Sequence, residues 1–163
     1  MKALLPLFTL STLLCCAFSF SAFAQSADET AIKNLIYQST EASLKGDYDT
    51  WAMKYAHDSD LYATGVSPSG NPAQRIGWEK FNEYRKNSIL ANAQKKNPSA
   101  PLIQENMIIK VNGNVAWAYY DQTEPNGNKS WQHRVLEKRN GEWKIVSLIS
   151  IYHDSSTKEA AKN

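Results

Sequence analysis

The feature that most constrains the fold is a pair of Asn-Gly dipeptides in the last third of the chain. Asn112-Gly113 and Asn140-Gly141 each separate two runs rich in β-branched and aromatic residues. Such a dipeptide is a strong hairpin signal, because both central residues of a type I′ turn have positive φ. The connection at 124–128 is longer and suits a wider loop. This pattern predicts a four-stranded antiparallel meander over 107–111, 115–122, 130–139 and 143–152.

Helical patterns and one short hairpin precede the meander. Apolar residues recur at helical spacing after a capping-box pattern at 26–29, and Gly46 provides a helix end. Because helices and strands are segregated along the chain, we predict an α+β domain with helices packed on one face of a bent sheet. The predicted elements are helices over 28–45, 48–56 and 77–95 and strands over 61–66 and 73–76.

The first 24 residues have the pattern of a secretory signal peptide. Lys2 precedes an apolar run over 4–20, and Ala22-Phe23-Ala24 forms a small-x-small cleavage site before Gln25. We therefore expect cleavage near Ala24-Gln25 and export to the periplasm or the medium, with no membrane attachment afterwards. The predicted organisation is a signal peptide (1–24), one domain (25–154) and a polar tail (155–163).

Composition excludes several classes of function for the mature domain. The chain has 2 cysteines, and both, Cys15 and Cys16, lie in the predicted signal peptide, which excludes disulfides and thiolate metal sites. The formal net charge of +2 includes Lys2 and is too small to favour nucleic acid as a partner. Ligand spacings for a metal and glycine-rich phosphate loops are absent. We predict no metal and no cofactor.

Several local sequences, taken in order, resemble the NTF2-like superfamily and its SnoaL-like branch. The matching pieces are Gly46-Asp47, Gly77-Trp78-Glu79, residues 114–119 and residues 134–145. The resemblance covers 28–153 and implies a cone-shaped, cystatin-like fold. In that fold three N-terminal helices pack on a strongly bent antiparallel sheet around a pocket. The resemblance also implies a homodimer formed through the outer face of the sheet.

Alternation along the strands divides each strand into two faces. The association domain of the calcium/calmodulin-dependent kinases is similar in its Arg-Val run, and this similarity implies that Arg134 is a pocket arginine and that Gln122 replaces a second one. The opposite face, with Trp117, Tyr119 and His133, would then form the dimer surface. The predicted pocket residues are Trp51, Tyr55, Tyr62, Tyr120, Gln122, Arg134, Leu136, Ser150 and Tyr152.

Three functions remain open from the sequence. The first is an exported protein that binds a small organic ligand in an aromatic pocket, with Arg134 as a cationic anchor suited to an anion. Arg134 would instead be structural if Glu29, Glu41 or another internal acid neutralised it. The second is an acid–base lyase, isomerase or hydrolase that uses His57, His133 or Asp121 as the base. The third is a non-catalytic oligomerisation or partner-binding domain whose cone is filled by side chains.

Overall fold

The computed structural model describes residues 27–94 and 100–153 of the 163-residue chain. The predicted signal peptide and polar tail lie outside the described residues. Every predicted helix and strand is present. The elements are a helix over 27–45, α2 (Tyr48–Met53), β1 (Tyr62–Val66), β2 (Pro72–Ile76), α3 (Trp78–Asn92), β3 (Ile103–Asn112), β4 (Val115–Thr123), β5 (Lys129–Arg139) and β6 (Glu142–His153).

Helix α2 is shorter than predicted, because the chain after it joins the sheet. The side chain of Asp47 caps the helix by accepting a hydrogen bond from the Thr50 amide at 3.1 Å. Helix α2 ends at Met53, and Tyr55 then forms a parallel bridge with Ile145 of β6. This bridge replaces the last turn that the apolar spacing had predicted.

The six strands form one sheet in the order β2-β1-β6-β5-β4-β3. The antiparallel meander β3–β6 is confirmed. Strand β1, however, runs parallel to β6, with Tyr62 opposite Ser147, so the sheet is mixed where the sequence predicted an antiparallel one. The parallel pair is possible because α3 and four strands (β2–β5) separate β1 from β6 in the chain, and no hairpin links the two strands.

Only one of the two Asn-Gly turns has the predicted geometry. At the β5–β6 hairpin Asn140 has φ 51° and Gly141 has φ 84°, as a type I′ turn requires. At the β3–β4 hairpin Asn112 still pairs with Val115, so that Gly113 and Asn114 form the loop. Of these two residues only Gly113 has positive φ, at 60°, which is the pattern of a type II′ turn.

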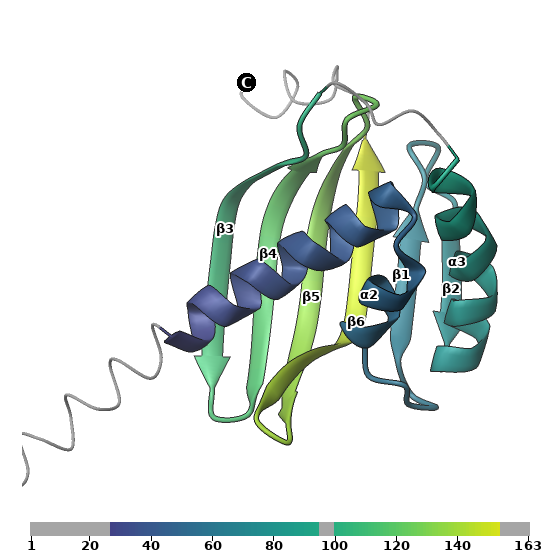
Figure 1. Cartoon of the computed structure of the whole chain (residues 1–163). Coiled ribbons are helices and arrows are strands. Elements are labelled where there is room, and N and C mark those ends of the chain that lie inside the picture. The colour runs from purple at the N-terminus through teal and green to yellow at the C-terminus, as the bar shows by residue number, and fades with distance from the viewer. Residues whose placement is uncertain (1–26, 95–99, 154–163) are drawn as a thin grey trace, which may run out of the picture.

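The helices cover one face of the sheet. Figure 1 shows the N-terminal helix running across β3–β6, with α2 after it and α3 beside β1 and β2. Tyr120 is buried on this face, whereas Trp117 and Tyr119 on the opposite face are 45% and 42% exposed. The inward register that placed Tyr120, Gln122 and Arg134 on the helix side is therefore confirmed. Pairing of two copies through the outer face stays a prediction.

A bulge changes the alternation within β6. Val135 of β5 pairs with Ser147, but the next residue, Leu136, pairs with Ile145, so β6 has one extra residue at this point. Strict alternation from the inward-facing Ser150 and Tyr152 had placed Ile145 on the outer face of β6. Because of the bulge, Ile145 is fully buried while Ser150 still faces inward from the other half of the strand.

Candidate functional site

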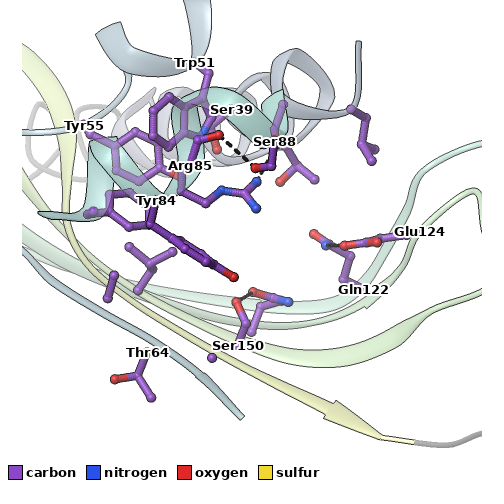
Figure 2. Close-up of a pocket in the computed structure, with 18 of the residues that line it drawn as sticks. Ser39, Trp51, Tyr55, Thr64, Tyr84, Arg85, Ser88, Gln122, Glu124 and Ser150 are labelled. Atoms are coloured by element: carbon purple, nitrogen blue, oxygen red, sulfur yellow. Dashed lines mark hydrogen bonds between the residues drawn. The ribbon is translucent and has the colours of Figure 1, made fainter. Parts of the chain in front are cut away.

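A cavity of about 590 Å³ lies between the helices and the sheet. Its walls come from the C-terminal half of the N-terminal helix, from α2 and α3, and from the strands β1, β2, β4, β5 and β6. Figure 2 shows the side chains that converge on it. Ligand pockets in proteins typically measure about 300–1,000 Å³. The cone is therefore not filled by side chains, which was the condition for a purely oligomeric domain.

Most of the predicted pocket residues line this cavity, and three do not. Tyr120 and Leu136 are buried too deeply in the core to reach it. Tyr62 alternates with the inward-facing Ala63, and its hydroxyl accepts a hydrogen bond from Gln74 of β2 at 2.8 Å. The predicted residues that do line the cavity are Trp51, Tyr55, Gln122, Arg134, Ser150 and Tyr152.

Arg134 lies on β5 in the cavity wall and is only 6% exposed. Its Nη1 donates to the backbone oxygens of His133 (2.9 Å) and Ile149 (3.2 Å), and its Nη2 donates to Gln132 Oε1 at 2.6 Å. Its Nε is buried and has no partner. Within the described residues no carboxylate pairs with this guanidinium. Among these residues neither Glu29 nor Glu41, the two acids named above, forms an ion pair with Arg134, and Glu41 pairs with Lys45.

Gln132 holds the guanidinium in place. Its Oε1 accepts hydrogen bonds from Arg134 Nη2 and from Ser150 Oγ, the latter at 2.7 Å, while its Nε2 donates to Ser130 Oγ at 2.6 Å. Gln132, Ser130 and Arg134 are all buried. Buried polar groups with satisfied partners are rigid, so Arg134 occupies a fixed position in the wall.

Two further arginines line the cavity, and the sequence analysis did not select either. Arg85 of α3 donates from Nη2 to Ser43 Oγ at 2.7 Å. The guanidinium carbon of Arg75 on β2 lies 3.5 Å from the centre of the Tyr84 ring, a cation–π contact. A signal for Arg85 existed, because it follows Phe81 and precedes Ile89 at four-residue intervals and both neighbours are buried. Arg75 had no comparable signal, because most of β2 is exposed.

The electrostatics of the cavity are positive. Among the lining residues that the structure describes, Glu124 is the one carboxylate, and Gln122 Nε2 donates to it at 3.4 Å. Burial raises the pKa of Tyr152, and the Glu124 carboxylate acts in the same direction, whereas Arg85 and Arg134 lower it. The Tyr152 hydroxyl therefore lies within electrostatic reach of both arginines. It is neutral at physiological pH and can donate a hydrogen bond.

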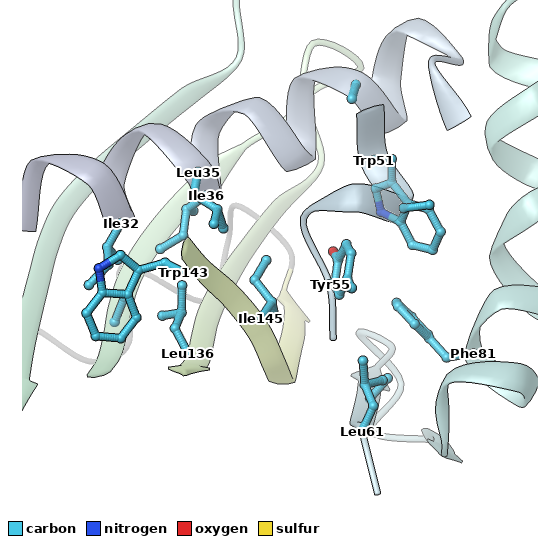
Figure 3. Close-up of a cluster of buried hydrophobic side chains, with 14 of the residues drawn as sticks. Ile32, Leu35, Ile36, Trp51, Tyr55, Leu61, Phe81, Leu136, Trp143 and Ile145 are labelled. Carbon is cyan, nitrogen blue, oxygen red and sulfur yellow. The ribbon is translucent and has the colours of Figure 1, made fainter. Parts of the chain in front are cut away.

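The rest of the interior is packed and apolar. Figure 3 shows Ile32 and Ile36 of the N-terminal helix meeting Leu136, Trp143 and Ile145 of the sheet. Aromatic rings separate this region from the cavity: the ring centres of Trp51 and Tyr55 lie 4.9 Å apart and those of Trp51 and Phe81 lie 5.5 Å apart. These three rings also form the apolar wall of the cavity.

The three candidate catalytic bases lie outside the cavity lining. His57 Nε2 lies 3.0 Å from the Ala52 oxygen, and its ring stacks on Trp78 with the centres 3.9 Å apart. His133 and Asp121 alternate with inward residues and so fall on the outer face. Burial, with Arg134 nearby, lowers the pKa of His133, and Asp121 accepts a hydrogen bond from Asn106 at 2.8 Å.

The described residues form neither a metal cluster nor a membrane-spanning helix. Residues 27–94 and 100–153 contain no group of three or more His, Cys, Asp or Glu side chains arranged to hold a metal ion. In the same ranges, none of the helices is both long enough and apolar enough to cross a membrane.

No family model and no curated protein matches the sequence, but solved structures are similar. An NTF2-like protein of unknown function from Shewanella baltica has 20% identity and a TM-score of 0.62, with 80% of this chain and 97% of that one covered. A cystatin-like fold protein from Burkholderia xenovorans has 12% identity and a TM-score of 0.59, over 76% and 90%. A proposed ketosteroid isomerase from Parabacteroides distasonis has 17% identity and a TM-score of 0.55, over 77% and 87%. The chain therefore has the NTF2-like, cystatin-like fold that its sequence resemblance implied.

Proposed function

We propose that this protein binds a small organic anion in the cavity and that Arg134 is the anchor. The observation that carries the proposal is the state of Arg134, which is buried in the cavity wall and bonded only to neutral oxygens. A buried guanidinium without a counter-charge is unfavourable. A ligand carboxylate supplies that charge and accepts charge-assisted hydrogen bonds. Each of these bonds is worth roughly 1.5–3 kcal/mol.

The remaining walls define the body of the ligand. Trp51, Tyr55 and Phe81 present aromatic surface from the helices, and Leu148 adds an aliphatic side chain from the sheet. Such walls favour a flat or compact apolar group, which gains affinity by leaving water. The volume of about 590 Å³ accommodates an organic acid of one or two rings.

Binding is favoured over acid–base catalysis by the composition of the cavity wall. The described lining residues include neither His nor Asp, and the three bases considered for catalysis lie elsewhere. The likeness to a proposed ketosteroid isomerase concerns the fold, and one fold supports many functions. We therefore propose a binding protein, exported after removal of residues 1–24.

The anchor is tested by titrating benzoate into the purified mature protein, with neutral benzamide as the isosteric ligand. Benzoate should bind and benzamide should bind much more weakly. Arg134→Met keeps much of the stem volume and removes the charge, so it should weaken benzoate binding about ten- to a hundredfold. Lys110→Met is the control, since it removes one exposed charge of β3 outside the cavity. Equal benzoate affinity in the wild type and Arg134→Met would overturn the proposal.

The predicted dimer rests on the exposed aromatic residues of the outer face. Trp117, Tyr119 and Trp131 lie on adjacent strands there and are each more than a third exposed. Apolar patches of this kind are uncommon on monomers. We propose that this face joins two copies of the chain. Trp117→Glu should then sediment as a monomer, and a wild type that is itself monomeric at micromolar concentration would refute the dimer.

A further inference from the structure

We infer that the cavity is built for an organic diacid, with one acidic group on Arg134 and the other on Arg85. The inference rests on the proposed anion-binding function and deepens it. Its starting point is that two guanidinium groups enter one cavity from different elements, Arg134 from β5 and Arg85 from α3. Figure 2 shows the Arg85 guanidinium extending from α3 into the cavity above the sheet.

Arg85 also has an incomplete set of contacts, although it is half-buried and makes fewer hydrogen bonds than Arg134. Its one hydrogen bond among the described residues goes to the hydroxyl of Ser43, a buried residue. A guanidinium carries five N–H donors in a planar fork. One neutral hydroxyl therefore fixes the direction of the group and leaves most of its donors for a ligand. No carboxylate within the described part of the chain pairs with it.

The third arginine of the cavity is different. The guanidinium carbon of Arg75 lies 3.5 Å from the centre of the Tyr84 ring, whereas that of Arg134 lies 5.7 Å from the centre of the Tyr120 ring, so an aromatic face stabilises the Arg75 cation far more closely. Arg75 and Tyr84 together connect β2 to α3 at the wall of the cavity. We therefore assign the two acidic groups of the ligand to Arg85 and Arg134 only.

Charge balance distinguishes a diacid from a monoacid. With one carboxylate bound to Arg134, Arg85 would remain without a counter-charge in a cavity whose described wall offers only Glu124. Arg85, Arg134 and Tyr152 line the same cavity, and both arginines lower the pKa of the Tyr152 hydroxyl. A diacid neutralises both guanidinium groups, and the Tyr152 hydroxyl in the same cavity can donate a hydrogen bond to it.

The test compares benzoate with its three dicarboxylate relatives, phthalate, isophthalate and terephthalate, which place the second acid at three different distances. Calorimetric titrations use the mature wild type, Arg85→Met, Arg134→Met and the control Lys110→Met. We expect the best diacid to bind the wild type about tenfold or more tightly than benzoate, as one additional charge-assisted contact provides. Arg85→Met should abolish this advantage and weaken benzoate only about two- to fivefold, as expected for the loss of one partly screened cavity charge, and Arg134→Met should weaken both ligands more strongly.

The outcomes separate the two proposals. If benzoate binds through Arg134 but no diacid binds more tightly, or if Arg85→Met keeps the advantage of the diacid, the diacid inference is wrong and the anion-binding function stands. If neither benzoate nor any diacid binds the wild type, both are wrong. Melting of each variant without ligand is measured first. Should Arg85→Met be unfolded, Arg85→Gln takes its place, because its amide can still contact Ser43, and the same loss of the diacid advantage is required.

Discussion

The two ends of the cone interior are made by the same secondary-structure elements and differ in chemistry. We call the packed region around Ile32, Leu136 and Ile145 the closed end, and the cavity around Ser43 and Arg134 the open end. The N-terminal helix, β4, β5 and β6 each contribute to both ends. One set of elements therefore provides a core and a binding site side by side.

The change from apolar to polar occurs within each element. The buried positions of the N-terminal helix change from Ile32 and Ile36 to Ser39 and Ser43. The inward residues of the strands change in the same direction in space, from Leu136 to Arg134 on β5 and from Ile145 to Ser150 on β6. The comparison teaches that stability should depend on the closed end and recognition on the open end, and each of the following changes tests this division.

The largest effect should come from Leu136→Ala at the closed end. Leu136 is fully buried, with an exposed fraction of 0%, and truncating such a leucine costs about 2–5 kcal/mol through lost burial and the cavity that remains. The matched control is Leu90→Ala, at a leucine that is 44% exposed on α3, which should change the free energy of unfolding by less than about 1 kcal/mol. Chemical denaturation measures both. A folded Leu136→Ala should retain the benzoate affinity of the wild type, and a selective loss of binding would contradict the division.

The next effect concerns the turn at Gly46, which we call the corner. It connects the N-terminal helix to α2 and lies against Ala93 at the end of α3. Gly46 has φ 78°, and a Cβ built on it would lie 2.6 Å from the Cα of Ala93. Gly46→Ala combines backbone strain with overlap against backbone and should cost on the order of 3 kcal/mol. Gly70→Ala is the matched control, because its φ is 81° with nothing within 4 Å, so only the strain of about 1 kcal/mol remains. Equal losses in the two variants would show that Ala93 does not constrain the corner.

A smaller effect is expected from Glu124→Gln, and its sign is opposite to that of the arginine variants. Glu124 brings the one carboxylate of the described cavity wall, beside Tyr152 and Gln122. The Glu124 carboxylate has the same negative charge as benzoate and repels it. Removing it should tighten benzoate binding about two- to fivefold, as expected for a partly screened charge. Glu105→Gln, on the exposed part of β3, is the control and should have no effect. Weaker binding in Glu124→Gln would mean that the carboxylate accepts a hydrogen bond from the ligand.

Local patterns made much of this structure predictable. The turn chemistry at Asn140-Gly141 and the alternation along β4 and β5 depend on neighbouring residues only. They were sufficient to predict the meander and to divide each strand into two faces, and the resemblance to the kinase association domain then selected the face of Gln122 and Arg134 as the inner one. The helix end at Gly46 followed from the same kind of information.

The features that were not predicted depend on contacts between distant segments. The bulge that buries Ile145 arises where β6 pairs with β5, and the parallel pairing of β1 with β6 joins segments about eighty residues apart. Arg85 enters the cavity only because α3 packs beside β1 and β2 and directs that face of the helix inward. A sequence pattern identifies the buried face of a helix, but it does not show whether that face meets a core or a cavity.

The smallest effect should come from an ion pair that fastens the closed end. Asp28 Oδ1 accepts hydrogen bonds from Lys138 Nζ at 2.7 Å and Trp143 Nε1 at 2.9 Å. The bond from Lys138 is the main reason that the pKa of Asp28 lies below its ordinary value of 3.8. Because the folded pKa is lowered, the contribution of the carboxylate to stability is present above pH 3.8 and is lost as the pH falls through the folded pKa.

Asp28→Asn should therefore cost about 0.5–1 kcal/mol at neutral pH, a value limited by solvent screening of this partly exposed pair. Its free energy of unfolding should approach that of the wild type as the pH falls from 3.8 through the lowered folded pKa, because the wild-type carboxyl group becomes protonated over that range and then resembles the amide. Asp60→Asn, at an exposed aspartate, controls for the amide substitution itself. Urea denaturation at a series of pH values measures the difference. A deficit that stays constant across the series would show that Asp28 fastens the closed end through neutral hydrogen bonds, without a contribution from its charge.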